Sequence, residues 1–507
     1  MGKIIRLYSV LIQFKKYLPA TDIIAVSVMF NIFTEIMVMK KLFTILFLAF
    51  ISSFFTTCEG QYTDLLNFNY RNGSSPVGNL IIAGNKLYGM TPIGGTDSGG
   101  VIFSIDTNGN GYKILLNFNG KNGAIPYGSL IISGGTLYGM ANQGGADSLG
   151  LIFSIDTNGN KYKDILDFNG INGSLPRSSL ILSGKTLYGM TSQGGADSDG
   201  VIFSIDTNGH EYKDLFDFNG LNGNAPVGDL TISGRKLYGM TPFGGLPHSA
   251  GNIFSIDTNG DGYKDLIDFV GPNGAEPQGN LVISDNKLYG MTGGGTYNSG
   301  AGNVFSIDTD GSGFNILVEF DTSIGSNPFG SLTFSGGSLY GMTELGSGFG
   351  GVIFSVDTSG NGFNDMFNFS RTNKEGEYPY NSLTLSGNML YGMTQYGGAD
   401  SNGVIFKFNY VTAGINNLIA SNGIIKVYPN PSNGVFNFVL SHPELVSGSQ
   451  TIEIYNVLGA KIYNETLKQV QGDNTINLSN QPNGIYLYRV LNENGGLIGE
   501  GKLIVQK

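Results

Sequence analysis

The sequence is poor in the residue types that most metal centres, catalytic triads and nucleic-acid interfaces need. Its 507 residues include one Cys, three His and no Trp, and only 13% of them are charged. A single Cys excludes a disulfide-stapled scaffold and a Cys-ligated zinc site, and three His leave little material for His-dependent catalysis. The formal net charge of −11 disfavours nucleic acid or an anionic membrane surface as a partner, because both attract basic proteins.

Glycine and aromatic residues are abundant instead. The chain contains 79 Gly, 33 Phe and 26 Tyr. Disordered Gly-rich linkers lack the aromatic residues that a core needs, and collagen needs a strict three-residue period with abundant Pro, which is absent here. The composition therefore predicts a large β protein punctuated by glycine.

The amino-terminal 60 residues have the features of a targeting segment. A basic start at Met39-Lys40-Lys41 is followed by the apolar run 42–55 and then by small residues around Cys58. This order is typical of a secretory signal peptide. We therefore predict that translation starts at Met39 and that cleavage leaves Gln61 as the new terminus.

Two alternatives for this segment stay open. Acylation of Cys58 would make the chain a lipoprotein, although Phe55-Thr56-Thr57 departs from the pattern that such a signal has before its cysteine. A membrane helix over 23–38 would be shorter than the about 20 residues that span a bilayer. We favour an ordinary secretory signal.

Internal repetition dominates residues 62–411. Each unit has about 50 residues, and the unit at 179–218 contains the runs Leu-Tyr-Gly-Met-Thr and Val-Ile-Phe-Ser-Ile-Asp. The tyrosine of the first run recurs at Tyr88, Tyr138, Tyr188, Tyr238, Tyr289, Tyr340 and Tyr391. The phenylalanine of the second run recurs at Phe103, Phe153, Phe203, Phe254, Phe305, Phe354 and Phe406. Each unit also carries one loop proline: Pro76, Pro126, Pro176, Pro226, Pro277, Pro328 and Pro379.

Each unit is expected to form four short β-strands, because runs of β-branched and aromatic residues alternate with Gly, Asn and Asp. Tandem four-stranded units of this length are typical of a β-propeller. The first repeated strand, 62–68, is a lone fourth strand, and the last unit supplies only three strands within 382–408. Pairing these segments would complete the last blade and remove the free sheet edges. The predicted fold class is therefore all-β, with a monomeric seven-bladed β-propeller over 61–411.

The repeats resemble a known family. Gly-x-Leu-Tyr-Gly-Met-Thr, a Gly pair and Gly-Val-Ile-Phe-Ser-Ile follow one another as in the GloVer tandem repeats of secreted and anchored bacterial proteins. The units also look like kelch blades, with Gly194-Gly195 at the place of the kelch Gly pair, but the kelch Trp is missing throughout. The resemblance implies the blade layout and no particular activity.

A second domain is expected after the linker 412–424. Short alternating apolar runs over 425–507 indicate a small C-terminal antiparallel β-sandwich. This segment resembles the type IX secretion sorting domain of Bacteroidetes, and the Asp that the family has in its middle motif is absent at Val457-Leu458-Gly459. The matching motif residues are Tyr428, Pro429, Asn430, Pro431, Gly484, Tyr486 and Lys502.

The resemblance to the sorting domain has implications for localisation and partners. It implies that the type IX secretion machinery is a partner and that the chain is exported through the outer membrane. It also implies removal of the domain and either surface attachment or release. Beyond this processing and anchoring, we expect no contact with a membrane.

One hairpin turn, 257–265, has the composition of a calcium loop. Calcium takes oxygen ligands at alternate positions, with a Gly for the sharp turn and a later carboxylate. Asp257, Asn259, Asp261 and Asp265 fit this pattern, whereas the other units lack at least one acidic position. Asp-Thr-Asn-Gly also forms a hairpin turn without a metal, because Asn-Gly accepts positive φ. Calcium is the one cofactor that the sequence suggests, at this loop alone.

A second candidate site lies in the loops between the second and third strands of the units. Gly-Gly-x-Asp-Ser occurs in four units that ring closure would make adjacent, with carboxylates at Asp97, Asp147, Asp197 and Asp400. These loops would share a face with the loops between blades, so their arc of carboxylates would hold a cation or a polar ligand. The alternative is that Asp and Ser only stabilise the turn.

Function is inferred from the symmetry of the units. Catalysis needs an asymmetric set of groups, whereas these loops are near copies and no unit has a large unique insertion. The repeated Tyr and Met are interpreted as packing between blades. We therefore predict a secreted or cell-surface binding module for a glycan, a protein or a matrix component, rather than an enzyme. The alternatives are a carbohydrate-active enzyme, either a polysaccharide lyase or a glycosidase, and a structural surface protein.

Overall fold

The computed structural model describes residues 61–294, 300–346, 349–371, 375–410, 425–428, 432–440, 450–456, 461–467, 474–491 and 497–507. The predicted signal peptide, its two alternatives and the predicted linker lie outside the described residues. Within the described ranges all regular structure is β-strand, and no helix is long and apolar enough to cross a membrane. The all-β prediction is confirmed.

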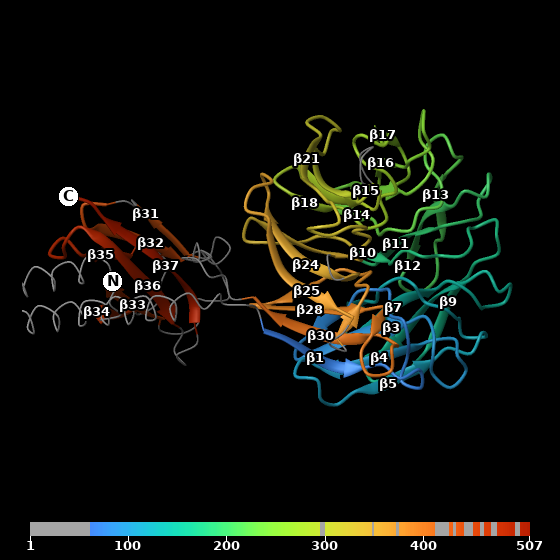
Figure 1. Ribbon diagram of the computed structural model, residues 1–507, viewed down its shortest axis with the longest axis horizontal. Coiled ribbons are helices and arrows are strands. Elements are labelled where there is room, and N and C mark those ends of the chain that lie inside the picture. Colours follow the sequence, from blue (N-terminus) through green and yellow to red (C-terminus); the bar gives the residue numbers. More distant parts are fainter. Residues whose placement is uncertain are drawn as a thin grey trace, which may run out of the picture. The chain divides into compact units, whose positions relative to one another are not determined.

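The repeat region consists of four-stranded antiparallel sheets built on one plan (Figure 1). In six of these sheets, four consecutive strands pair in chain order. Three of them contain β2 (Ile81–Ala83), β3 (Lys86–Thr91), β4 (Val101–Asp106) and β5 (Lys113–Asn117); β6 (Ile131–Ser133), β7 (Thr136–Ala141), β8 (Leu151–Asp156) and β9 (Lys163–Asp167); and β10 (Ile181–Ser183), β11 (Thr186–Thr191), β12 (Val201–Asp206) and β13 (Lys213–Asp217).

The next three sheets follow the same order. They contain β14 (Thr231–Ser233), β15 (Lys236–Thr241), β16 (Asn252–Asp257) and β17 (Lys264–Asp268); β18 (Val282–Ser284), β19 (Lys287–Thr292), β20 (Asn303–Asp308) and β21 (Asn315–Glu319); and β22 (Thr333–Ser335), β23 (Ser338–Thr343), β24 (Phe349–Asp357) and β25 (Asn364–Ser370). A further sheet has the order β1-β30-β28-β27, with β1 (Gln61–Asn67), β27 (Thr384–Ser386), β28 (Met389–Thr394) and β30 (Val404–Asn409). A small two-stranded sheet pairs β26 (Gly376–Glu377) with β29 (Tyr396–Gly397).

The sheets of the repeat region are arranged around a common centre. In Figure 1 the short first strands β10 and β14 lie near this centre, and the last strands β9 and β13 lie at the outer edge. This arrangement is consistent with a propeller-like fold. It brings the segments that precede the first strands of all the sheets close to one another.

The two ends of the repeat region are joined. Strand β1 pairs antiparallel with β30, from Gln61 opposite Asn409 to Asn67 opposite Val404. Side-chain hydrogen bonds then connect this sheet to the sheet of β2–β5. The Nδ2 atom of Asn381 donates to the carbonyl of Gly78 at 3.2 Å, and the backbone N–H of Ser382 donates to Oδ1 of Asn79 at 2.7 Å.

The repeated aromatic and methionine side chains pack between neighbouring sheets, which confirms how they were interpreted from the sequence. One buried cluster joins Tyr88 and Met90 of β3 to Leu137 of β7 and Phe153 of β8. The glycine between each repeated Tyr and Met leaves room for the ring of the next strand. A Cβ atom on Gly139 would lie 2.7 Å from Cζ of Phe153, closer than any normal carbon contact.

Residues 425–507 form two antiparallel sheets with a shared core. One has the order β31-β32-β35, with β31 (Ile425–Tyr428), β32 (Val435–Leu440) and β35 (Asn474–Asn477). The other has the order β34-β33-β36-β37, with β33 (Gln450–Asn456), β34 (Lys461–Leu467), β36 (Gly484–Leu491) and β37 (Leu497–Val505). Side chains of both sheets belong to one buried cluster, in which the rings of Phe438 and Tyr488 meet edge to face at 4.9 Å.

Candidate functional site

The repeats converge on one cavity of about 280 Å³. Its wall comes almost entirely from the Pro-x-Gly-(Ser/Asn/Asp)-Leu segment that precedes the first strand of each sheet, and Gln395 completes it. The leucine of this segment is buried in every unit, with at most 4% of its surface exposed. Each unit therefore anchors its share of the wall in the core and presents the two or three preceding residues to the cavity.

Hydrogen bonds of one kind link neighbouring units at six boundaries around the cavity. In each bond the backbone N–H of one unit donates to the side-chain oxygen of the equivalent residue in the next unit. The bonds are Asn79 to Ser129 (2.7 Å), Ser129 to Ser179 (2.7 Å), Ser179 to Asp229 (2.5 Å), Asn280 to Ser331 (2.8 Å), Ser331 to Ser382 (2.7 Å) and Ser382 to Asn79 (2.7 Å). These bonds use a backbone N–H group and a side-chain oxygen of each linked pair of units. They fix the wall of the cavity before any ligand binds.

Five units need glycine in this wall because neighbouring backbones approach closely there. A Cβ atom on Gly228 would lie 2.1 Å from the carbonyl oxygen of Gly279, and one on Gly330 would lie 2.2 Å from that of Asn381. Two units replace this glycine. Ser178 accepts a hydrogen bond from the backbone N–H of Met190, and Asn381 reaches Gly78 as described above.

The position between the repeated proline and this glycine differs from unit to unit, although its surroundings are repeated. Its occupants are Val77, Tyr127, Arg177, Val227, Gln278, Phe329 and Tyr380, and all of them line the cavity. Arg177 is exposed and the other six are half-buried. One cavity therefore collects three aromatic rings, a guanidinium and an amide at equivalent places in a repeated frame.

These side chains contact one another across unit boundaries. The guanidinium carbon of Arg177 lies 5.4 Å from the ring centroid of Tyr127, within the range of a cation–π interaction. The rings of Phe329 and Tyr380 are 5.0 Å apart and tilted, and the Tyr380 hydroxyl donates to Oε1 of Gln278 at 2.7 Å. Burial is the main cause that raises the pKa of Tyr380, so its hydroxyl stays protonated and acts as a donor at neutral pH.

One carboxyl group lies in the wall of the cavity. Asp229 accepts the backbone N–H of Ser179 through Oδ1. Burial raises the pKa of Asp229, and its hydrogen bonds with Ser179 partly oppose this shift. Among the described residues that line the cavity, Arg177 is the only basic one and Asp229 the only acidic one.

Sequence reasoning missed this site. The loops of the units are near copies, so the candidate residues were taken from the positions that the units share. The one signal in the sequence is that the residue after the repeated proline varies among aliphatic, aromatic, amide and cationic types, but the residue before the proline varies as widely. The two positions that flank this residue, the repeated proline and the following glycine, hardly vary.

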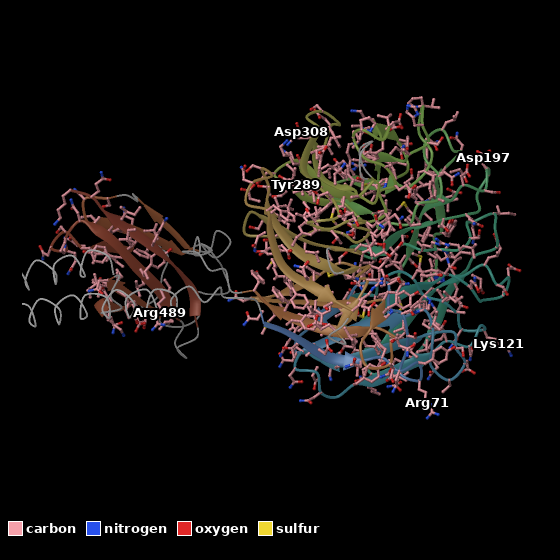
Figure 2. All side chains as sticks on the ribbon, in the orientation of Figure 1. Arg71, Lys121, Asp197, Tyr289, Asp308 and Arg489 are labelled. Atoms are coloured by element: carbon pink, nitrogen blue, oxygen red, sulfur yellow. The ribbon has the colours of Figure 1, made fainter. Side chains whose placement is uncertain are left out.

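The predicted carboxylate arc lies elsewhere. Asp97, Asp147, Asp197 and Asp400 are all exposed, and Figure 2 shows Asp197 at the edge of the repeat region. The serine after each of them has a positive φ of 58° to 65°, so the Asp-Ser pair forms a tight turn. No group of three acidic, His or Cys residues in the described ranges is placed to hold a metal ion.

Residues of the last strands hold these turns in place. The Oδ1 atom of Asp167 accepts the backbone N–H of Ala146 at 3.0 Å, and that of Asp217 accepts the N–H of Ala196 at 2.8 Å. A second cavity lies beside the Asp197 loop and is lined by Ser198, Asp214 and Asp217 among others. Burial, with the charge of Asp217, raises the pKa of Asp214.

The four residues of the suggested calcium loop have other partners. The ammonium of Lys236 lies 3.0 Å from Oδ1 of Asp257, and Nδ2 of Asn259 donates to Oδ2 of Asp261 at 2.8 Å. Asp265 accepts from Nδ2 of Asn252 at 3.3 Å, and burial raises the pKa of Asp265 to about 6. The Asp257 carboxylate already has a counter-cation, so calcium would have to displace Lys236 there.

The sorting-motif residues that the structure describes lie on strands β31, β36 and β37. Tyr428 ends β31, and Pro429, Asn430 and Pro431 lie outside the described residues. Gly484 begins β36, opposite Val505 of β37, and Lys502 lies on β37. Tyr486 is buried and its hydroxyl donates to the carbonyl of Pro482 at 2.8 Å.

Some solved structures show low similarity to this chain. The tricorn protease is 12% identical, with 83% of this chain and 44% of that chain covered and a TM-score of 0.35. The extracellular domain of a one-component system from B. thetaiotaomicron is 14% identical, with 88% and 59% covered and a TM-score of 0.46. The chain thus spans about half the length of these two proteins. The polysaccharide lyase Uly1 is 11% identical, with 68% and 91% covered and a TM-score of 0.39.

Family models match most of the sequence. The Gloeobacter/Verrucomicrobia repeat matches residues 54–200, 182–350 and 298–437, and the secretion system C-terminal sorting domain matches residues 426–506. No curated protein matches this sequence. The sorting domain indicates export through type IX secretion to the cell surface or the extracellular space. The chain belongs to the Gloeobacter/Verrucomicrobia repeat family and carries a C-terminal secretion sorting domain.

Proposed function

We propose that this exported chain is a binding module, a seven-bladed β-propeller followed by a small antiparallel β-sandwich, and that it binds a glycan in the cavity where its repeats converge. One observation carries the proposal: the residue after the repeated proline differs in chemical type from unit to unit, and all its copies line that cavity. A residue needed only for packing would be repeated with the rest of the unit. Variation at this one place is what a ligand without sevenfold symmetry requires.

The chemistry of the cavity favours a sugar over an apolar ligand. Tyr127, Phe329 and Tyr380 offer ring faces, on which the C–H groups of a sugar ring pack. Gln278 and Asp229 offer hydrogen-bonding groups for hydroxyls. The cavity is slightly smaller than the about 300–1,000 Å³ of most ligand pockets, so it takes one or two sugar rings of a longer chain.

Binding to immobilised glycans tests the proposal. The purified exported protein should bind a subset of glycans, and Tyr127→Ala should weaken that binding by about 30-fold, the ~2 kcal/mol of a buried aromatic contact. Asp197→Ala is the matched control, because it removes an exposed loop side chain outside the cavity. If Asp197→Ala weakened binding and Tyr127→Ala did not, the binding site would lie at the predicted carboxylate arc. If the protein bound no glycan at all, the proposal would be contradicted.

A carbohydrate-active enzyme is the second candidate, and the cavity beside the Asp197 loop favours it. Asp214 and Asp217 lie three residues apart on β13 and line that cavity, and burial raises the pKa of Asp214. A carboxyl group with a raised pKa next to a second carboxylate can serve as a general acid. Release of reducing or unsaturated sugar ends that disappears in Asp214→Asn would support the enzyme, and no product from any bound glycan would exclude it.

A further inference from the structure

Arg177 is the single cation of the central cavity. Six of the seven units place a neutral residue after the repeated proline, and the described lining residues include no Lys and no other Arg. No ion pair with a carboxylate is formed by Arg177 within the described part of the chain, whereas Lys86, Lys236 and Lys287 each pair with an aspartate of their own sheet. The guanidinium of Arg177 therefore keeps its fork of N–H donors available to an occupant of the cavity.

Tyr127 holds this guanidinium at the wall. The guanidinium carbon lies 5.4 Å from the ring centroid, so the cation–π interaction favours a position of the Arg177 head group at this wall. A planar fork of N–H donors matches a carboxylate, which accepts two parallel hydrogen bonds. A ligand that fits this end of the cavity therefore carries a carboxylate.

The opposite arc of the cavity fits the rest of a sugar ring. Phe329 and Tyr380 come from units three and four places further round than Arg177, and their rings present an apolar surface beside the amide of Gln278. Asn381 lines the same wall with 3% of its surface exposed. Its Oδ1 is buried and accepts no hydrogen bond within the described residues.

We propose that the central cavity binds a carboxylated sugar, such as a uronic acid residue of an acidic polysaccharide. Its carboxylate pairs with Arg177, and its ring lies against Phe329 and Tyr380. This inference rests on the proposed function, because it names the class of glycan that the binding module takes. It assigns Arg177 as the residue that selects acidic over neutral sugars.

Oligosaccharides that differ only in the carboxylate measure its contribution to binding separately from that of the sugar rings. The probes are oligogalacturonate, oligoguluronate and oligoglucuronate, each compared with its carboxyl-reduced counterpart by titration calorimetry on the full exported chain. A charge-assisted hydrogen-bonded pair contributes about 1.5–3 kcal/mol. We therefore expect at least one acidic probe to bind about 10-fold more tightly than its reduced form.

Variants assign that preference to one side chain. Arg177→Gln should abolish the preference for the acidic probe over its reduced counterpart, and Arg177→Lys should restore only part of it, because an ammonium lacks the planar fork. Arg71→Gln, at an exposed cation that Figure 2 shows at the edge of the repeat region, is the control and should change neither affinity. Thermal melting of each variant checks that it is folded.

Each other outcome overturns the inference in a distinguishable way. Equal binding of acidic and reduced probes, or a preference that survives Arg177→Gln, would refute the role of Arg177 and leave glycan binding intact. Binding to a peptide carboxyl terminus but to no saccharide would refute the sugar and keep the carboxylate. Binding to no saccharide and no peptide would refute the proposed function as well.

Discussion

Replacing Gly189 by alanine tests the reason why the repeats contain Tyr-Gly-Met. A Cβ atom at this position would lie 2.7 Å from Cζ of Phe203 and 3.0 Å from Cδ2 of Leu180, where carbon atoms normally stay about 3.5–4.0 Å apart. Phe203 and Leu180 are fully buried, so neither side chain can move into solvent to relieve the clash. One of them, or the backbone of β11, has to shift.

The expected cost follows from two opposing effects. Overpacking a well-packed core costs about 1–3 kcal/mol. Alanine also restricts the unfolded chain, which stabilises the folded state by about 0.4–1 kcal/mol, and Gly189 has no left-handed φ that would penalise alanine. We therefore expect Gly189→Ala to lower the free energy of unfolding by about 1–2 kcal/mol.

A double-mutant cycle identifies the clash as the cause. Guanidinium unfolding would be followed by circular dichroism and tyrosine fluorescence, since the chain has no Trp. Phe203→Leu removes the outer ring atoms, so it should cost at least about 0.5 kcal/mol less in the Gly189→Ala background than in the parent chain. In the control Gly184→Ala, nothing lies within 4 Å of the new Cβ and φ is +63°, so its cost should not depend on Phe203. Additive effects at Gly189 and Phe203 would refute the close-packing explanation.

Three further predictions follow from the charges and the sorting domain. Partial burial, with the charge of Asp167, raises the pKa of Asp164 to about 6, so the stability that its protonated form gives is fully present below about pH 4 and is lost as the pH rises through 6. Asp164→Asn should therefore raise the melting temperature at pH 7.5 and flatten its pH dependence. The gain in unfolding free energy should stay under ~1 kcal/mol, because water still reaches and screens much of this side chain. If calcium binds at Asp257, a chelator should lower the melting temperature, and an unchanged temperature would leave Lys236 as the only counter-cation there. Deleting 425–507 should trap the protein in the cell envelope, and display of the truncated chain at the cell surface would contradict the sorting assignment.

The sequence alone was sufficient to predict the structural features that recur in every unit. The Tyr-Gly-Met run predicted packing between sheets, and Phe153 against Gly139 shows why both residues are repeated. The family and the sorting domain were also predictable, because their motifs are continuous in the chain. These features depend on sequence patterns within one segment of the chain, and the repeat pattern is the easier to recognise because it occurs seven times.

The cavity was not predictable in the same way, because its residues are about 50 positions apart and meet only when the ring of units forms. The contact of Arg177 with Tyr127 and the hydrogen bond from Tyr380 to Gln278 both cross unit boundaries. The Asp-Ser loops were predicted to bind a ligand because they repeat. The positive φ of Ser198 and the hydrogen bond from the Ala196 N–H to Asp217 show that the repeated residues form a turn.

A repeat protein separates folding from recognition within its own sequence. Each unit must supply the same buried leucine, glycine and phenylalanine, since every neighbour packs against the same surface, and any departure costs stability at two interfaces. The side chain after the repeated proline is exempt from this constraint. The residue two positions later makes the hydrogen bonds that hold the backbone, and the variable side chain lines the cavity. Exchanging Arg177 for the residue of another unit should therefore alter what the protein binds while its unfolding midpoint stays constant. An exchange that changed both equally would show that this position belongs to the core after all.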